Sequence, residues 1–269
     1  MKLFDAISKL KSAGVESPEY DAREIFRHIG KMPISSLISK DAGSSLPEID
    51  AAVERRCKRE PLQYIIGSVD FYRESYRVTP ECLIPRQETE LLVDYAVKHL
   101  PDECEFIDLC TGSGCIAVST LKNTKNTHAA AVDISDGALS LAEYNAIQNG
   151  VSDRVQFIKK DVLKDAVNKE FYAVISNPPY VTESAYRSLA PEIYFEPKIA
   201  FVGDDSGLIF YKRILELYKD KINPRGFFAF EIGYDQGASL KEIADTHKME
   251  CEIIKDYSSN DRIAVIRKK

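Results

Sequence analysis

The sequence lacks the features that would place the protein in a membrane or outside the cell. It has no run of the roughly 20 apolar residues that a helix needs to span a bilayer, so no membrane partner is expected. Its first residues, MKLFDAISKLKSAG, mix charged with apolar side chains, whereas a signal peptide has an unbroken apolar core. We therefore expect a cytoplasmic protein.

Residues that form disulfides or bind metals are few and scattered. The sequence has no tryptophan and only four histidines, none of them at the spacing of metal ligands. Its six cysteines include no CxxC pair, and a chain of this length does not need disulfides to be stable. Reduced thiols and no metal site are therefore predicted.

An excess of basic residues is also missing. The formal net charge is -6, which argues against a protein whose main affinity comes from nucleic-acid phosphates. One local basic run, ERRCKRE at residues 54–60, is open to two interpretations, a solvated helix face or a patch that binds phosphates. We favour the helix face, so no direct nucleic-acid binding is expected.

What is present divides the chain into three predicted parts. Residues 1–65 repeat apolar side chains every three or four positions, which predicts a small helical domain. Residues 66–85 are rich in aromatic and β-branched side chains around a polar Arg-Glu-Ser break, which predicts a β-hairpin linker. Residues 86–269 alternate the patterns of strands and helices.

The third part predicts an α/β fold with a doubly wound, seven-stranded and mainly parallel sheet. Strands that alternate with helices pair in parallel, and the helices cover both faces. Strands are predicted at 105–110, 128–133, 155–159, 171–176 and 226–232, with two short ones at the C-terminus, and helices at 88–100, 114–121, 137–149, 208–222 and 236–247.

A glycine-rich loop follows the first of these strands. In EFIDLCTGSGCIA the strand runs into Thr-Gly-Ser-Gly and then a helix, so Gly112 and Gly114 allow the backbone to approach a ligand. A tight turn without a ligand is the alternative. Asp133 ends the next strand, about 20 residues after Gly112, where an acid is placed to bind a ribose diol. Because no third glycine follows, a nucleoside without a pyrophosphate fits better than a dinucleotide.

The segment VISNPPYV ends a later strand. Two prolines cannot continue a central strand, so it stops near Ser176 and holds Asn177 at its end. Ligands bind beyond the carboxyl ends of parallel strands, so Asn177 is expected beside the glycine loop and Asp133. A stiff turn without a function is the other interpretation of an Asn-Pro pair.

Six segments together resemble the PrmC/HemK family, the protein-(glutamine-N5) methyltransferases of peptide-chain release factors, within the class I S-adenosylmethionine-dependent methyltransferases. The resemblance covers essentially the whole chain, and the IPRQETE element is the most specific part of it. The segments are LIPRQETELLV (83–93), DLCTGSGCIA (108–117), SNPPYV (176–181), YFEPKIAFVGDDSGL (194–208), FEIGYDQG (230–237) and DYSSNDRIAVIRK (256–268).

The resemblance implies roles for individual residues. Asn177, Pro178 and Tyr180 would be catalytic, because the carbonyl groups of Asn177 and Pro178 can accept the N–H groups of an amide while Tyr180 offers it a flat face. Pro179 would complete this substrate clamp. The residues implied in binding S-adenosylmethionine are Cys110, Thr111, Gly112, Ser113, Gly114, Asp133, Asp161, Val162 and Asn177, of which Cys110 replaces a glycine that many relatives have.

For four residues, a purely structural role is an alternative to binding a ligand. Asp161 contacts the adenine or caps a helix. Arg86 and Glu90 contact a ligand or begin a helix. Glu196 shapes the acceptor pocket or ends a helix.

The resemblance implies methyl transfer from S-adenosylmethionine to the glutamine amide in the GGQ motif of class 1 release factors. A monomer is expected, in which the helical domain recognises the release factor. Two alternatives stay open. A DNA or RNA amino-methyltransferase shares the NPPY motif, but the net charge counts against it. A non-catalytic binding protein would not need the loop, the acid and NPPY together.

Overall fold

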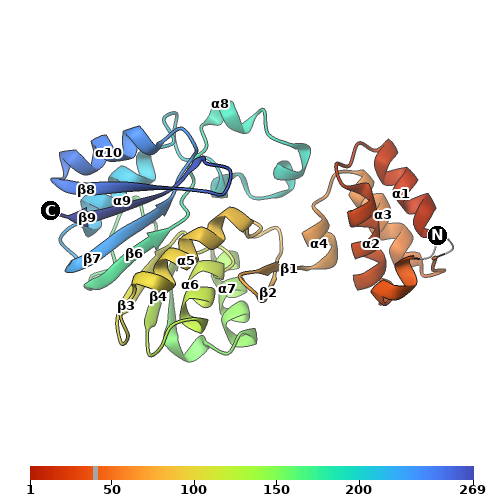
Figure 1. Ribbon diagram of the computed structural model, residues 1–269, viewed down its shortest axis with the longest axis horizontal. Coiled ribbons are helices and arrows are strands. Elements are labelled where there is room, and N and C mark those ends of the chain that lie inside the picture. The colour runs from red at the N-terminus through yellow and green to blue at the C-terminus, as the bar shows by residue number, and fades with distance from the viewer. Residues whose placement is uncertain (39–41) are drawn as a thin grey trace. The chain divides into compact units, whose positions relative to one another are not determined.

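The computed structural model describes residues 1–38 and 42–269 and contains two compact units (Figure 1). We call them the helical unit and the sheet unit. The helical unit consists of Met1–Ser68, Val78–Pro80 and Ala190–Glu196, and the sheet unit of Val69–Arg77, Glu81–Leu189 and Pro197–Lys269. The chain therefore returns to the helical unit after the NPPY motif. The predicted domain limits of 1–65, 66–85 and 86–269 stay a prediction.

The helical unit confirms the helical pattern of the N-terminal residues. It contains α1 (Leu3–Ser12), α2 (Pro18–His28), η1 (Ile34–Ile38), α3 (Pro47–Cys57) and α4 (Leu62–Ile66). Prolines occupy the first positions of α2 and α3, where their missing N–H costs no hydrogen bond. The core of this unit is closed by fully buried side chains that include Leu10, Ile25, Phe26 and Val53.

The basic run at 54–60 forms a solvated face only in part, since Arg55 and Lys58 are exposed and Arg56 and Arg59 are not. Arg56 is only 6% exposed, and its guanidinium donates to Asp21 Oδ2 at 2.6 Å and to Glu192 Oε1 at 3.0 Å. Arg59 donates to both carboxylate oxygens of Glu192, at 2.6 and 2.8 Å. The interpretation as a solvated face is therefore wrong for Arg56 and Arg59, because carboxylates shielded from water need charged partners. These guanidinium groups are also committed to carboxylates, not to phosphates.

The sheet unit contains the predicted seven-stranded sheet, in the order β5-β4-β3-β6-β7-β9-β8. Neighbours from β5 to β7 are parallel, and β9 runs antiparallel to both β7 and β8. The strands are β3 (Glu105–Leu109), β4 (His128–Asp133), β5 (Val155–Lys159), β6 (Phe171–Ser176), β7 (Ile222–Glu231), β8 (Met249–Lys255) and β9 (Asp261–Lys268).

Helices cover both faces of this sheet (Figure 1). One buried cluster joins the sheet to α5 (Glu90–His99), α6 (Cys115–Lys122) and α7 (Asp136–Gln148), and another joins the opposite face to α9 (Ile209–Tyr218) and α10 (Gly237–Thr246). Alternate residues of a strand point to opposite faces, so neighbours such as Phe106 and Ile107 belong to different clusters. The predicted doubly wound fold is confirmed.

Shorter elements connect this frame. The predicted hairpin is formed by β1 (Ser68–Phe71) and β2 (Glu74–Arg77). The remaining short helices are η2 (Gln87–Thr89), η3 (Ser152–Arg154), α8 (Glu183–Tyr186), η4 (Pro191–Phe195) and η5 (Lys198–Ala200).

Two adjacent predicted boundaries are wrong by four residues each. The helix expected at 208–222 ends at Tyr218, and β7 begins at Ile222 instead of Gly226. The pairing with β6 shifts register between its first two contacts, Phe171 with Ile222 and Ala173 with Phe227, which leaves room for an Asn-Pro pair within the strand. Gly226 is required there, because an added Cβ would lie 2.0 Å from the Tyr172 carbonyl oxygen.

Candidate active site

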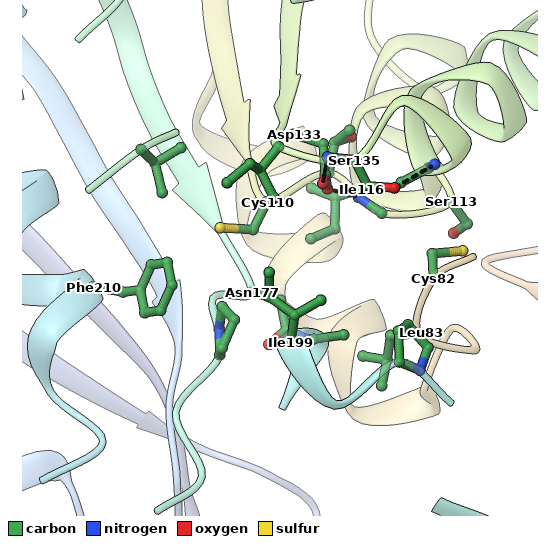
Figure 2. Close-up of a pocket in the computed structure, with 18 of the residues that line it drawn as sticks. Cys82, Leu83, Cys110, Ser113, Ile116, Asp133, Ser135, Asn177, Ile199 and Phe210 are labelled. Carbon is green, nitrogen blue, oxygen red and sulfur yellow. Dashed lines mark hydrogen bonds between the residues drawn. The ribbon is translucent and has the colours of Figure 1, made fainter. Parts of the chain in front are cut away.

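Three predicted site segments meet at one cavity of the sheet unit. It has a volume of about 380 Å³, within the usual range for small-molecule sites, and its lining includes Cys110, Asp133 and Asn177 (Figure 2). These residues follow or end β3, β4 and β6, which lie side by side in the sheet. After β3 the chain winds outward to β4 and β5 and then returns to β6 on the other side of β3. The cavity thus lies at the topological switch point, where doubly wound folds bind ligands.

The glycine-rich loop is tied down by a buried aspartate. Asp108 is 0% exposed, and its Oδ2 accepts the Thr111 hydroxyl at 2.6 Å and the Ala117 N–H at 3.2 Å. Its Oδ1 has no hydrogen-bond partner among the residues that the structure describes. Burial raises the pKa of this carboxyl to about 7. Asp108 therefore holds the loop, and the structure leaves half of its carboxyl unsatisfied.

The two glycines of the loop have different tasks. Both have left-handed φ values, +54° for Gly112 and +79° for Gly114. An added Cβ on Gly112 would meet only Cys82 Cβ, at 3.7 Å, and Gly112 lines the cavity. An added Cβ on Gly114 would lie 2.9 Å from Ala142 Cβ, and Gly114 does not line the cavity. Gly112 leaves space toward the cavity, whereas Gly114 allows close packing of helix α7; the roles of both glycines in binding the cofactor stay predictions.

Asp133 stands where the sequence places it, at the carboxyl end of β4. Its Oδ2 accepts the Gly112 N–H at 2.9 Å, and its Oδ1 accepts the Ser135 N–H at 3.0 Å. Ser135 in turn caps α7 by accepting the Ala138 N–H. The carboxylate is thus oriented by two backbone donors and is half-buried at the cavity wall, where it can accept hydrogen bonds from a diol.

The segment after β5 contributes a turn and no helix. Asp161 accepts the Leu163 N–H at 3.0 Å and pairs with Lys164 at 3.0 Å, and the pairing with Lys164 lowers the pKa of Asp161. The helix-cap alternative for Asp161 is wrong, because residues 162–164 form only a turn. Asp161, Val162 and Leu163 all line the cavity.

Asn177 is held by an element far from it in sequence. Its side-chain Nδ2 donates to Thr89 Oγ1 at 3.2 Å, and Thr89 Oγ1 donates to Glu231 Oε2 at 2.6 Å. Thr89 is 2% exposed and Glu231 is 3% exposed. No hydrogen bond to Asn177 Oδ1 comes from the described part of the chain, so this oxygen is available to a ligand.

The other residues of the NPPY motif differ in their position relative to the cavity. Pro179 lines the cavity, whereas Pro178 and Tyr180 are not among the described residues that form its wall. The Tyr180 hydroxyl donates to Glu231 Oε1 at 3.2 Å. Tyr180 therefore braces the same glutamate as Thr89, and its stacking role stays a prediction.

The three residues with lesser support have separate places. Arg86 lines the cavity and directly precedes η2. Glu90 accepts the Tyr72 N–H at 2.9 Å and so braces the hairpin. Glu196 is 4% exposed and belongs to the helical unit. Glu90 is also the first residue of α5, which agrees with the helix-start alternative, and its contact with a ligand stays a prediction.

Several residues of the site are missed by short-range patterns in the sequence. Thr89 lies within the IPRQETE element and Glu231 within FEIGYDQG, but neither carried a local pattern that indicated its partner. The apolar wall formed by Leu83, Ile199 and Phe210 was also missed (Figure 2). These side chains come from segments that only the fold brings together, so short-range motifs contained no signal for them.

The lining suits a nucleoside joined to an amino acid. Gly112 leaves space against the backbone, and Asp133 supplies an oriented acid for ribose hydroxyl groups. Ile134, Val162 and Leu163 add apolar surface beside that acid, as a base requires. The residues present therefore fit S-adenosylmethionine.

Comparison with known proteins gives the same result. The family model of the methyltransferase small domain matches residues 87–196, and that of the PrmC N-terminal domain matches residues 3–67. The release factor glutamine methyltransferase of Fusobacterium nucleatum subsp. nucleatum is 32% identical over 276 residues, which cover 98% of this chain and 77% of that protein. The protein of the same name from Moorella thermoacetica is 32% identical, and the alignment covers 97% of this chain and 95% of that protein.

Two further comparisons are less informative about function. The chain spans 56% of the length of a bifunctional methyltransferase from Rickettsia prowazekii, to which it is 33% identical. The crystal structure of the hMettl16 catalytic domain in complex with the MAT2A 3'UTR hairpin 6 superposes with a TM-score of 0.57 at 16% identity, covering 82% of this chain and 81% of that chain. This second likeness shows the fold alone. The match to full-length relatives is more specific, and on it the chain belongs to the PrmC/HemK family of S-adenosylmethionine-dependent release factor glutamine methyltransferases.

Proposed function

We propose that this protein transfers a methyl group from S-adenosylmethionine to the side-chain amide nitrogen, N5, of the glutamine in the GGQ motif of class 1 release factors. One observation carries the proposal. The Asn177 amide at the end of β6 is tied through its Nδ2 to Thr89, which leaves Oδ1 for a ligand in the cavity. A carbonyl oxygen in that place suits an acceptor that presents an NH₂ group.

The chemistry explains why such an oxygen is needed. The lone pair of an amide nitrogen is delocalised, so the nitrogen is a weak nucleophile and must be aimed accurately. Asn177 Oδ1 and the Pro178 carbonyl can each accept one N–H of the acceptor. They would fix its orientation and stabilise the positive charge that develops on nitrogen. When bound, S-adenosylmethionine supplies the electrophilic methyl group.

The remaining residues have binding tasks. Asp133 would hold the ribose, and Gly112 would let the loop backbone approach the cofactor. Ile199 and Phe210 would keep water from the acceptor nitrogen. No strong base is required, because the nitrogen loses its proton readily once it is alkylated. The carbonyl groups of Asn177 and Pro178, which accept hydrogen bonds from the substrate amide, are therefore the main contribution of this chain to the reaction.

We assign discrimination of the release factor to surface outside this cavity. A free glutamine carries the same amide, so the clamp alone does not distinguish it from the GGQ loop. The helical unit offers a separate surface for that purpose. Its ion-paired Arg56 and Arg59 favour a protein partner over a polyanion.

Methylation of DNA or RNA is the second candidate, because nucleic-acid amino-methyltransferases share the NPPY motif that follows β6. Two observations count against it. The net charge is -6, and the arginines of the basic run are engaged by carboxylates. Extruding a base from a duplex requires a surface that grips phosphates.

The test is incubation with a labelled methyl donor and one of four acceptors: a class 1 release factor, a short GGQ peptide, DNA or RNA. We expect label on the release factor, with mass spectrometry placing it on the GGQ glutamine and much less label on the peptide. Label on DNA or RNA alone would overturn the proposal. Binding of the donor without transfer to any acceptor would favour the non-catalytic alternative.

A further inference from the structure

Three residues from separate elements form a hydrogen-bonded line behind the cavity. Glu231 ends β7, Thr89 ends η2 and Asn177 follows β6. Glu231 Oε2 lies 2.6 Å from Thr89 Oγ1, which lies 3.2 Å from Asn177 Nδ2. Glu231 and Thr89 are almost completely buried, whereas Asn177 reaches the cavity. The line therefore connects a buried carboxylate to the side chain that would meet the acceptor.

The donors and acceptors along this line fix the direction of its hydrogen bonds, from Asn177 to Thr89 to Glu231. An ionised carboxylate only accepts hydrogen bonds, and a threonine hydroxyl has a single proton to donate. Because Thr89 gives that proton to Glu231, its oxygen can only accept from Asn177. The Asn177 side chain must then turn its NH₂ toward Thr89 and its oxygen toward the cavity. The opposite orientation would place the amide oxygen against the Thr89 oxygen with no proton between them.

Both carboxylate oxygens of Glu231 accept hydrogen bonds, as this direction requires. Its second oxygen, Oε1, accepts the Tyr180 hydroxyl at 3.2 Å, so both oxygens receive donors. Burial raises the pKa of the Glu231 carboxyl, whereas the Thr89 hydroxyl, the positive charge of Arg262 and the Tyr180 hydroxyl act to lower it. Tyr211 donates to the backbone carbonyl of Glu231 at 2.9 Å and so anchors the end of β7.

We propose that Thr89 and Glu231 are positioning residues that hold the Asn177 amide with its oxygen facing the acceptor nitrogen. The inference rests on the proposed function, because the orientation matters only for an acceptor that presents N–H groups. A reversed amide would point its own NH₂ at the acceptor NH₂, and two donors facing each other cannot form a hydrogen bond. Thr89 and Glu231 thus act through Asn177.

The test compares Thr89→Val, which keeps the shape and removes the hydroxyl, with Thr89→Ser, which keeps the hydroxyl. For Thr89→Val we expect kcat on the release factor to fall at least about tenfold, as for a misaligned reacting group. Its KM and its affinity for S-adenosylmethionine should stay within about threefold. Thr89→Ser should retain about half of the wild-type kcat or more. Glu231→Gln should lower kcat by less than Thr89→Val, because the amide oxygen of Gln can still accept from Thr89 while only the bond from Tyr180 is lost.

Thr120→Val is the matched control. Thr120 lies in α6, is fully buried, and its hydroxyl has no partner among the described residues. The same substitution there should leave kcat unchanged. Melting temperatures of all variants show whether each remains folded.

A double-mutant cycle with Asn177→Ala separates positioning from a merely structural role. If Thr89 acts through Asn177, adding Thr89→Val to Asn177→Ala should cause no further loss. A full additional loss would overturn the inference, as would a Thr89→Val enzyme that is as active as Thr120→Val. An equal loss in Thr89→Val and Thr89→Ser would also overturn it.

Failure of the proposed function gives a different result. In that case the wild-type protein does not label the release factor at all. If it labels a nucleic acid instead, the same variants assayed on that acceptor still decide whether Thr89 positions Asn177. If the wild-type protein labels no acceptor, both proposals fall.

Discussion

The two sides of the cavity hold their functional groups by different means. On the side that we propose binds the cofactor, Asp133 accepts from Ser135, two residues away, and from Gly112, 21 residues away, and both donors are backbone N–H groups. On the side that we propose binds the methyl acceptor, Asn177 donates to Thr89, 88 residues away, and Thr89 donates to Glu231, 142 residues away. The first side depends on local backbone geometry, and the second on side chains that only the complete sheet brings together.

This difference has a consequence for mutation. Backbone donors remain when a side chain is changed, so damage on the cofactor side should stay local and appear as weaker binding. Side-chain partners are lost when they are replaced, so damage on the acceptor side should spread along the Glu231–Thr89–Asn177 line and appear as slower turnover. Substitutions on the two sides of the cavity should therefore affect different quantities, binding on one side and turnover on the other.

The largest effect is expected for Asn177→Ala. Loss of one preoriented carbonyl typically costs about 3 to 4 kcal/mol of transition-state stabilisation, so turnover should fall by a factor of several hundred. Affinity for S-adenosylmethionine should stay within about tenfold. Single-turnover kinetics and calorimetry measure the two effects, with Asn168→Ala, an exposed asparagine outside the cavity lining, as the control. Near-normal turnover would contradict the assigned role of Asn177.

Asp133→Ala should show the opposite pattern. The ribose hydroxyl groups would lose a charged acceptor worth about 1.5 to 3 kcal/mol, so affinity for S-adenosylmethionine should fall about 10- to 150-fold. At saturating cofactor, kcat should be much less affected. Calorimetry on this variant and on Asp153→Ala, an exposed aspartate outside the cavity lining, tests the expectation. Equal affinities would mean that Asp133 only braces the loop.

The pH dependence of stability tests the role of Asp108 without any bound ligand. Burial raises the pKa of its carboxyl from 3.8 to about 7, so between these values the folded protein binds this proton and the unfolded chain does not. The contribution of Asp108 to stability is therefore present below about pH 4 and declines as the pH rises to about 7. The Asp108→Asn variant should lack this decline.

Chemical denaturation at several pH values measures the free energies of unfolding that decide this. From pH 4 to pH 7 the free energy of unfolding of wild type should fall steadily relative to that of Asp108→Asn. The variant should therefore be relatively more stable at the higher pH. Asp153→Asn controls for the loss of one negative charge. A constant difference across this range would show that Asp108 is ionised in the folded protein throughout.

The cofactor side was largely predictable from the sequence for the reason given above. A glycine loop and an acid at consecutive strand ends are local patterns, and parallel strands bring their carboxyl ends together. Asp133 and Asn177 were therefore placed correctly at the ends of β4 and β6. The task of Gly114 was not predictable, because it depends on Ala142 in the next helix.

The acceptor side and the basic run needed the fold. Thr89 and Glu231 gain their meaning from partners about 90 to 140 residues away, a relation that no short motif records. Arg56 was expected to be solvated, because nothing near it in sequence indicates Asp21 or Glu192 as its partners. Patterns within one element predict its type, whereas buried polar pairs between elements follow only from their packing.

The smallest effect is expected at Cys110, the first residue of the loop after β3. Its φ is +61°, a conformation that costs a residue with a Cβ roughly 1 to 2 kcal/mol and costs glycine almost nothing. Cys110→Gly should relieve this strain, at the expense of about 0.5 to 1 kcal/mol from the greater freedom of the unfolded chain. We expect a net stabilisation below about 1 kcal/mol and an affinity for S-adenosylmethionine within about threefold of wild type.

Cys104→Gly is the matched control for this change. Cys104 is half-buried like Cys110 but is not among the residues with positive φ, so glycine there brings the entropic loss without any relief of strain. The two substitutions should therefore change the free energy of unfolding with opposite signs. If both destabilise the protein equally, Cys110 is held without strain, and the packing of its thiol beside β6 outweighs its backbone conformation.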